Sequence, residues 1–144
     1  MIHAEEKGGA INCFDSKLVK YLRNCDFFML NNEFCISDRG EPMTDKAYTF
    51  RSSPSNISIL KELGVDAVSL ANNHVYDYGE EAFFDTMDHL KEAELPYVGA
   101  GYNVNEAAEG HYFIINGFKV GVVATSRADI GSSNRIISGF NTSV

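Results

Sequence analysis

The stretch Ser69–Gly79, SLANNHVYDYG, lies where a predicted strand meets a predicted helix. An apolar run over residues 65–70 leads into it and a helical pattern begins at Glu80, so the polar residues 72–74 stand at the end of a buried strand. In open α/β sheets, ligand-binding and catalytic residues lie at such strand ends. Two carboxamides and an imidazole suit a divalent metal ion and a proton transfer beside it. These three residues therefore predict half of a metal site.

The composition is typical of a single globular domain that can bury a core. The chain has 144 residues, of which 44% are hydrophobic and 22% charged, and its net charge is −8. Because this charge repels nucleic-acid phosphates, we expect no nucleic-acid partner. No apolar run reaches the roughly 20 residues that cross a bilayer, and residues 1–10 lack the apolar core of a signal peptide. The three cysteines are an odd number without Cys-x-x-Cys spacing, so we expect free or buried thiols at Cys13, Cys25 and Cys35.

Apolar periodicity and turn residues predict alternating helices and short strands. The predicted helices span residues 15–24, 53–64 and 80–94, with a helical turn at 106–108. The predicted strands span residues 27–30, 48–50, 65–70, 96–98, 111–115 and 118–124. Between the last two strands, Asn116 and Gly117 are a strong signal for a tight hairpin. This order predicts an α/β layered fold with a mostly parallel sheet and an added β-hairpin.

A second polar cluster, Asn31, Asn32 and Glu33, follows the first predicted strand. If that strand is a parallel neighbour of the strand before residues 72–74, both clusters emerge at the same edge of the sheet and converge. A carboxylate there can bridge two cations, and a nearby histidine can protonate a leaving oxygen. The simpler alternative is a pair of polar loops, in which His74 and its neighbours satisfy backbone groups and the carboxylate is solvated.

Two further side chains have competing interpretations. Asp77 and Glu80 have the form of a capping box, so we prefer Asp77 as a helix cap over Asp77 as a metal ligand. Arg51 carries a guanidinium that matches phosphate and carboxylate geometry, which makes it a candidate for substrate binding. A surface ion pair is the preferred alternative for this arginine.

Five segments of the chain carry a family resemblance. They are residues 30–33 (LNNE), 48–54 (YTFRSSP), 63–79 (LGVDAVSLANNHVYDYG), 85–86 (DT) and 98–101 (VGAG). Together they resemble the CapA family of capsule and poly-γ-glutamate biosynthesis proteins, a branch of the calcineurin-like metallophosphoesterases. The resemblance runs from about Asp26 to Ala124. It implies part of a layered α/β/β/α metallophosphoesterase-like sandwich, with two divalent metal ions in the intact family fold and no distinction among Mn, Zn and Mg.

The resemblance also implies roles for the polar residues. Asn73 would be a metal ligand, and His74 would be the general acid or a phosphate contact. Glu33 would be the bridging or first-metal ligand. The residues that would support these groups or contact substrate are Asn31, Asn72, Arg51 and Asp77. The family also begins with a strand that carries a Gly-Asp motif and has later histidines, and neither feature occurs in this sequence.

The missing motifs predict that the chain is an internal portion of such a domain. We expect one partial domain over residues 1–144, poorly ordered ends at 1–12 and 126–144, an incomplete metal site and no enzymatic activity of this chain alone.

The resemblance leaves open a metal-dependent phosphoesterase-like hydrolase of cell-envelope polymer synthesis, a non-catalytic component of polymer assembly or export, and an inactive truncated fragment. The implied partners are an anionic polymer or phosphoester substrate and membrane proteins of capsule synthesis or export. The implied location is the extracytoplasmic cell envelope.

Overall fold

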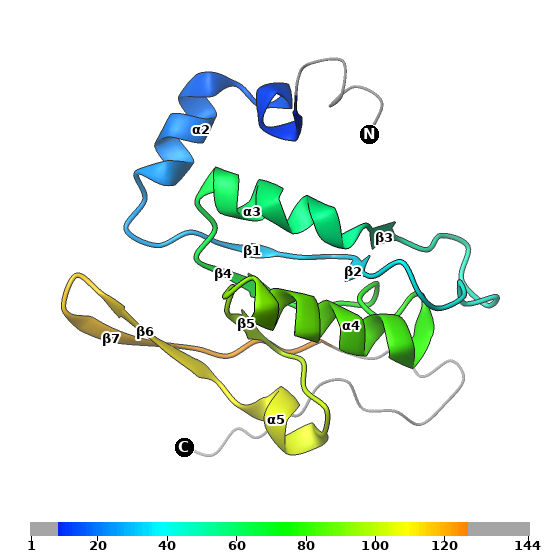
Figure 1. The fold of residues 1–144 in the computed structure, drawn as a ribbon. Coiled ribbons are helices and arrows are strands. Elements are labelled where there is room, and N and C mark those ends of the chain that lie inside the picture. Colours follow the sequence, from blue (N-terminus) through cyan, green and yellow to red (C-terminus); the bar gives the residue numbers. More distant parts are fainter. Residues whose placement is uncertain (1–8, 127–144) are drawn as a thin grey trace.

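Three short parallel strands form the centre of the computed structural model, which describes residues 9–126 (Figure 1). The strands are β1 (Met29–Asn31), β4 (Ala67–Ser69) and β5 (Tyr97–Val98), paired in the order β1-β4-β5. Ala67 and Val68 of the central strand β4 have no solvent exposure, as expected for apolar residues of a strand that is covered on both faces. Asn31 of β1 stands beside Ser69 of β4, so both strands end at one edge of the sheet.

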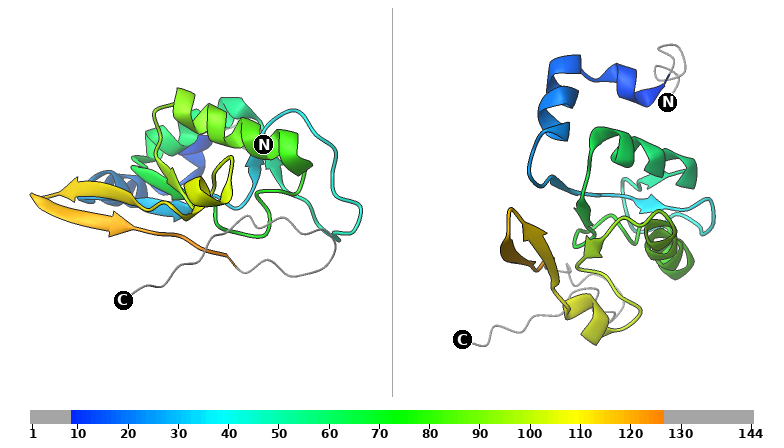
Figure 2. Two further views of the ribbon diagram at one scale, coloured as in Figure 1. Left: turned by 90° about the horizontal axis from the view of Figure 1, so that it is seen from below. Right: turned by 60° about the vertical axis from the view of Figure 1, so that its left-hand side comes forward.

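Helices α3 (Ile57–Leu63) and α4 (Gly79–Glu92) connect these strands and lie on one face of the sheet (Figures 1 and 2). Right-handed crossovers between successive parallel strands place both helices on that face. The inward side of α4 buries Phe83, Met87 and Leu90 against the sheet, at the helical spacing expected from the sequence. These side chains join Val68 and the other strand residues in one hydrophobic core.

Two smaller pairs of strands flank the central sheet. Parallel strands β2 (Cys35–Ile36) and β3 (Arg51–Ser52) form the first pair, and antiparallel strands β6 (His111–Ile115) and β7 (Phe118–Val122) form the second. Asn116 and Gly117 have φ values of 50° and 82°, as a type I′ turn requires. The predicted hairpin is confirmed, and it extends away from the layered part of the fold (Figure 2).

The remaining helices are short. They are the 3₁₀ turns η1 (Ala10–Cys13) and η2 (Pro54–Asn56), and the helices α2 (Ser16–Arg23) and α5 (Val104–Ala108). Asp15 caps α2, since its side chain accepts hydrogen bonds from Lys17 N (2.9 Å) and Leu18 N (3.2 Å). Gly64 ends α3 with a φ of 82°, the left-handed conformation that favours glycine at a helix end.

The predicted capping role of Asp77 is wrong. The residue at the cap position of α4 is Tyr78, and no side-chain hydrogen bond caps this helix. Gly79 has a φ of 80°, so the chain turns between Asp77 and the rest of the helix. The Asp77 carboxylate is instead buried, and it pairs with the distant Lys46 and with His74 of the same turn.

Other differences concern short elements. The structure has β3 at Arg51–Ser52 rather than at residues 48–50, and strand β2 was not predicted. Residues 10–13 form a 3₁₀ turn that overlaps the end 1–12, for which we expect poor order. Residues 1–8 and 127–144, on which the rest of that prediction falls, lie outside the described residues.

The predicted fold class is confirmed: the chain is mixed α/β, and its sheet strands are mostly parallel with an added hairpin. Across the described part of the chain, no helix is both long enough and apolar enough to cross a membrane.

Candidate functional site

Asn72 joins the ends of β1 and β4. Its side-chain NH₂ donates hydrogen bonds to Asn31 Oδ1 (3.0 Å) and to the carbonyl oxygen of Asn32 (2.9 Å). Its Oδ1 accepts hydrogen bonds from the backbone N–H groups of His74 (3.0 Å) and Val75 (2.9 Å). One carboxamide therefore holds the two polar clusters together and shapes the turn that carries His74. The clusters meet at one edge of the sheet, as the geometry of parallel strands predicts.

Glu33 is connected to this junction through Asn31. The NH₂ group of Asn31 donates a hydrogen bond to Glu33 Oε2 (2.9 Å), while its Oδ1 accepts one from Asn72. Glu33 and Asn73 are both exposed, so solvent reaches the two side chains that the sequence predicts as metal ligands.

His74 is paired with a buried carboxylate. Its Nδ1 lies 2.8 Å from Asp77 Oδ2, and the Asp77 side chain has no solvent exposure. An ionised carboxylate only accepts hydrogen bonds, so this contact favours the tautomer of His74 that carries its hydrogen on Nδ1. The His74 side chain keeps 16% of its surface exposed. Asp77 therefore contacts the His74 ring rather than capping the following helix, and a supporting role for Asp77 in catalysis stays a prediction.

Two further residues complete the surroundings of Asp77. Lys46 Nζ forms an ion pair with Asp77 Oδ1 (2.5 Å) and also donates to the carbonyl oxygen of Asn73. The backbone N–H of Phe50 donates to Asp77 Oδ2 (2.7 Å), and the Phe50 ring lies against the His74 ring with centroids 4.4 Å apart. The buried carboxylate thus has an opposite charge and three donors.

Sequence reasoning missed Lys46 and Phe50. They belong to a segment without helix or strand, and they lie 31 and 27 residues from Asp77. No spacing rule links residues that far apart. The sequence feature that could have indicated Phe50 was the YTFRSSP segment of the resemblance, but in this segment we considered only Arg51 as a site residue.

Among residues 9–126, the contacts of Arg51 are not the surface ion pair that was preferred for it. Its guanidinium donates a hydrogen bond to the Gly40 carbonyl oxygen (2.8 Å) and lies over the Tyr78 ring, 3.7 Å from the centroid. These contacts tie the 37–50 loop to the residue at the start of α4. Arg51 is exposed, and substrate binding by this arginine stays a prediction.

Asn32 is nearly fully buried, with 1% exposure. Its NH₂ group donates to the Phe34 carbonyl oxygen (2.8 Å), whereas its Oδ1 has no hydrogen-bond partner among the described residues. A buried carboxamide oxygen without a donor is costly, and such groups often face a ligand or an ordered water.

The donors at this edge suit a divalent metal ion in kind but are few in number. Glu33, Asn73 and His74 offer a carboxylate, an amide and an imidazole, whereas Mn²⁺ or Mg²⁺ takes a larger, oxygen-rich set. Within residues 9–126 no group of three or more His, Cys, Asp or Glu side chains is placed to hold a metal ion. These residues therefore fit part of a metal site.

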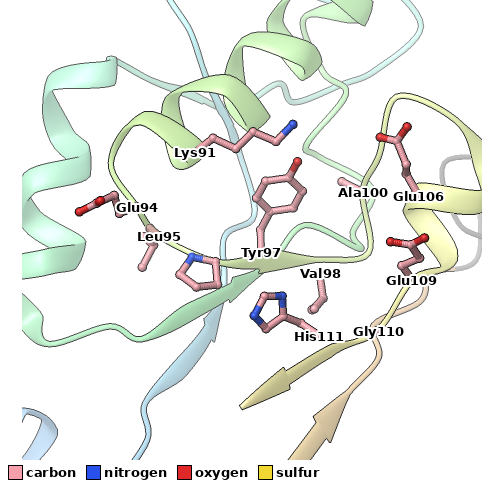
Figure 3. A pocket seen from close by; sticks show the side chains of 11 residues that line it. Lys91, Glu94, Leu95, Tyr97, Val98, Ala100, Glu106, Glu109, Gly110 and His111 are labelled. Atoms are coloured by element: carbon pink, nitrogen blue, oxygen red, sulfur yellow. The ribbon is translucent and has the colours of Figure 1, made fainter. Parts of the chain in front are cut away.

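The cavity shown in Figure 3 is separate from this cluster. It has a volume of about 480 Å³ and lies along β5, with Lys91, Tyr97, Glu109 and His111 among its lining residues. None of its lining residues belongs to the Asn31–Asn72–His74 cluster. The His74–Asp77 pair therefore lies outside this cavity.

The fold and the site define an α/β protein with a histidine–carboxylate pair at the carboxyl edge of a parallel sheet. The family model described as "Bacterial capsule synthesis protein PGA_cap" matches residues 3–140, and the chain belongs to this family. The resemblance to CapA proteins is thereby confirmed.

Two relatives illustrate the relationship. The chain is 31% identical over 116 residues to "Capsule biosynthesis protein CapA" of Bacillus anthracis, which covers 78% of this chain and 28% of that protein. It is 30% identical over 77 residues to "PGA biosynthesis protein CapA" of Bacillus subtilis (strain 168), which covers 53% of this chain and 20% of that protein. The chain thus matches less than a third of the length of these relatives.

Proposed function

We propose that this chain carries the proton-transfer half of a metal-dependent phosphoester-hydrolysing site in a protein of capsule or poly-γ-glutamate synthesis. The observation that carries the proposal is the buried Asp77 carboxylate on Nδ1 of His74, at 2.8 Å. A histidine held in this way has Nε2 available for a reacting group, as a general acid requires. Family membership supports the setting in polymer synthesis.

The chemistry assigned to His74 is protonation of the departing oxygen. As the phosphorus–oxygen bond breaks, the proton moves from Nε2 to that oxygen and the imidazolium becomes neutral. Asp77 stabilises the imidazolium before the transfer, and Asn72 fixes the backbone of the turn that presents the ring. General acid catalysis of this kind contributes about 10²–10⁴ in rate.

Glu33 and Asn73 are the residues of this chain that would hold a divalent metal ion. When bound, such an ion supplies Lewis-acid stabilisation of the phosphoryl oxygens and an activated water. Because the described residues offer only a partial donor set, we expect them to bind Mn²⁺ or Zn²⁺ weakly.

Calorimetric titration with inorganic phosphate or orthovanadate in the presence of Mn²⁺ tests the proposal. We expect a Kd of about 1 mM, that is about −4 kcal/mol, and binding at least about tenfold weaker in His74→Ala and Asn73→Ala. His89→Ala is the matched control, because His89 Nδ1 also lies near a carboxylate three residues later, Glu92, at 3.7 Å. Absence of binding, or equal binding by wild type and His74→Ala, contradicts the proposal.

A second candidate is a non-catalytic component that binds the anionic polymer during assembly or export. It is favoured by the small donor set around Glu33 within the described residues. It predicts that poly-γ-glutamate binds equally well to wild type and His74→Ala, while orthovanadate does not bind at all. For either function, an extracytoplasmic location and partners among membrane proteins of capsule synthesis or export are proposed from the family alone.

A further inference from the structure

The segment of residues 43–51 packs against the turn of residues 73–78, although the segment before β3 has no helix or strand. Met43 N donates a hydrogen bond to the Asp77 carbonyl oxygen (2.8 Å). Further along, Phe50 donates its backbone N–H to the Asp77 carboxylate (2.7 Å). Contacts at both ends of the segment therefore converge on one residue of the turn.

Lys46 makes the contact in this segment that reaches two parts of the turn at once. Its ammonium group forms an ion pair with Asp77 Oδ1 (2.5 Å) and donates to the carbonyl oxygen of Asn73. The Lys46 side chain keeps only 27% of its surface exposed, whereas the Asp77 side chain has none. One charged group thus spans the turn on both sides of His74.

The two oxygens of the Asp77 carboxylate have different partners. Oδ1 receives Lys46, and Oδ2 receives both His74 Nδ1 and the Phe50 backbone N–H. With Oδ1 held by the lysine, the carboxylate cannot rotate away without leaving a buried charge unpaired. Oδ2 therefore stays directed at Nδ1 of the imidazole.

We propose that Lys46 is a positioning residue, which acts through Asp77 to hold the His74 ring with Nδ1 on the carboxylate and Nε2 available for proton transfer. The inference rests on the proposed function, because a fixed orientation of the His74 ring matters for catalysis only if His74 protonates a leaving oxygen. It predicts which nitrogen of the His74 ring carries the hydrogen, and this can be measured without metal or substrate.

The alternative is an ion pair that stabilises the fold and has no effect on the ring. The two roles are separated by long-range ¹H–¹⁵N spectra of the histidine side chains, recorded in alkaline solution where imidazole is neutral. These spectra distinguish a ring that carries its hydrogen on Nδ1 from one that carries it on Nε2. The His74 signals are identified by their loss in His74→Gln.

Wild type should show His74 as a single tautomer with the hydrogen on Nδ1. Lys46→Met should lose this single pattern and give a mixture of both tautomers, and Asp77→Asn should give the same loss with the lysine present. Lys61→Met is the matched control, because Lys61 Nζ also donates to a carbonyl oxygen, that of Ala93 (2.8 Å), and should leave the His74 pattern unchanged.

An unchanged His74 pattern in folded Lys46→Met overturns the inference. Circular dichroism shows whether each variant folds, and the shorter polar variant Lys46→Gln replaces Lys46→Met if the latter does not. A wild-type spectrum with the hydrogen on Nε2 overturns the inference whatever the variants show. Failure of phosphate or orthovanadate binding would contradict the proposed hydrolysis while leaving this spectroscopic result unaffected.

Discussion

Replacing Asp77 by asparagine should destabilise the protein more than replacing any exposed acidic residue. The substitution keeps the shape of the side chain but removes the charge that faces Lys46. The NH₂ group of the asparagine would also face a hydrogen-bond donor at a position where the carboxylate has an acceptor oxygen. Breaking a buried ion pair costs about 3–5 kcal/mol. Because Lys46 is 27% exposed and can be solvated, we expect the lower end, about 3 kcal/mol.

This free energy corresponds to a large shift in melting temperature. At about 2.1 cal/mol/K per residue, the unfolding entropy of 144 residues is about 0.3 kcal/mol/K. A loss of about 3 kcal/mol therefore lowers Tm by about 10 °C. Urea unfolding followed by circular dichroism measures the free energy of unfolding, and scanning calorimetry measures Tm.

The matched control is Asp66→Asn. Asp66 Oδ2 also accepts a short backbone hydrogen bond, from Phe28 N at 2.7 Å, but the residue is exposed. We expect a loss of about 1 kcal/mol or less for this variant. If Asp77→Asn costs no more than the control, the carboxylate is not the buried anchor of the His74 turn, and the reasoning about the site fails.

Three other perturbations test the surroundings of the site. The Arg39 guanidinium lowers the pKa of the Asp85 carboxyl, so the stabilisation from this carboxylate is present above the unfolded pKa of about 3.9 and is lost as the pH falls through the lower folded value. Asp85→Asn should therefore be less stable than wild type at neutral pH, and the difference in urea midpoint should shrink in acid. A difference that stays constant with pH argues against this. Burial raises the pKa of the Cys35 thiol to about 11, so a thiol reagent at about pH 8 should label the two exposed cysteines and reach Cys35 only in denaturant. Labelling of all three cysteines in the native protein would contradict this. Gly40→Ala should cost about 2 kcal/mol in urea unfolding, because Gly40 has a φ of 82° and an added Cβ would meet the carbonyl oxygen of Tyr78; a neutral effect would mean that the loop can move away from α4.

Most of the fold could be predicted because local signals agreed with the tertiary structure. Asp15 caps α2, Gly64 ends α3, and the Asn116–Gly117 pair turns the hairpin. Each of these effects depends on residues within a few positions of one another, which is the range over which capping and turn chemistry operates. Strand β2 was missed because two residues are too few for a periodic pattern.

The site was predicted only in part, for a different physical reason. Asn72 and His74 were found because they stand directly after a buried strand, a position that sequence shows. Asp77 was assigned to the wrong partner, because an aspartate before a helix satisfies the capping pattern whether or not its side chain turns inward. Lys46 could not be found, and Phe50 was covered only by the YTFRSSP segment, since no rule of spacing connects either residue with the turn that it contacts.

The sequence by itself determined the alternating α/β order, the mostly parallel sheet, and the two polar clusters at its strand ends. It did so because these features follow from apolar periodicity and turn residues that act over a few positions. Only the tertiary structure decided that Asp77 faces His74 and Lys46 rather than the helix. A buried carboxylate takes the opposite charge and the donors that folding brings to it. Lys46 and the Phe50 N–H came from a segment about thirty residues away, whereas the His74 ring came from the same turn.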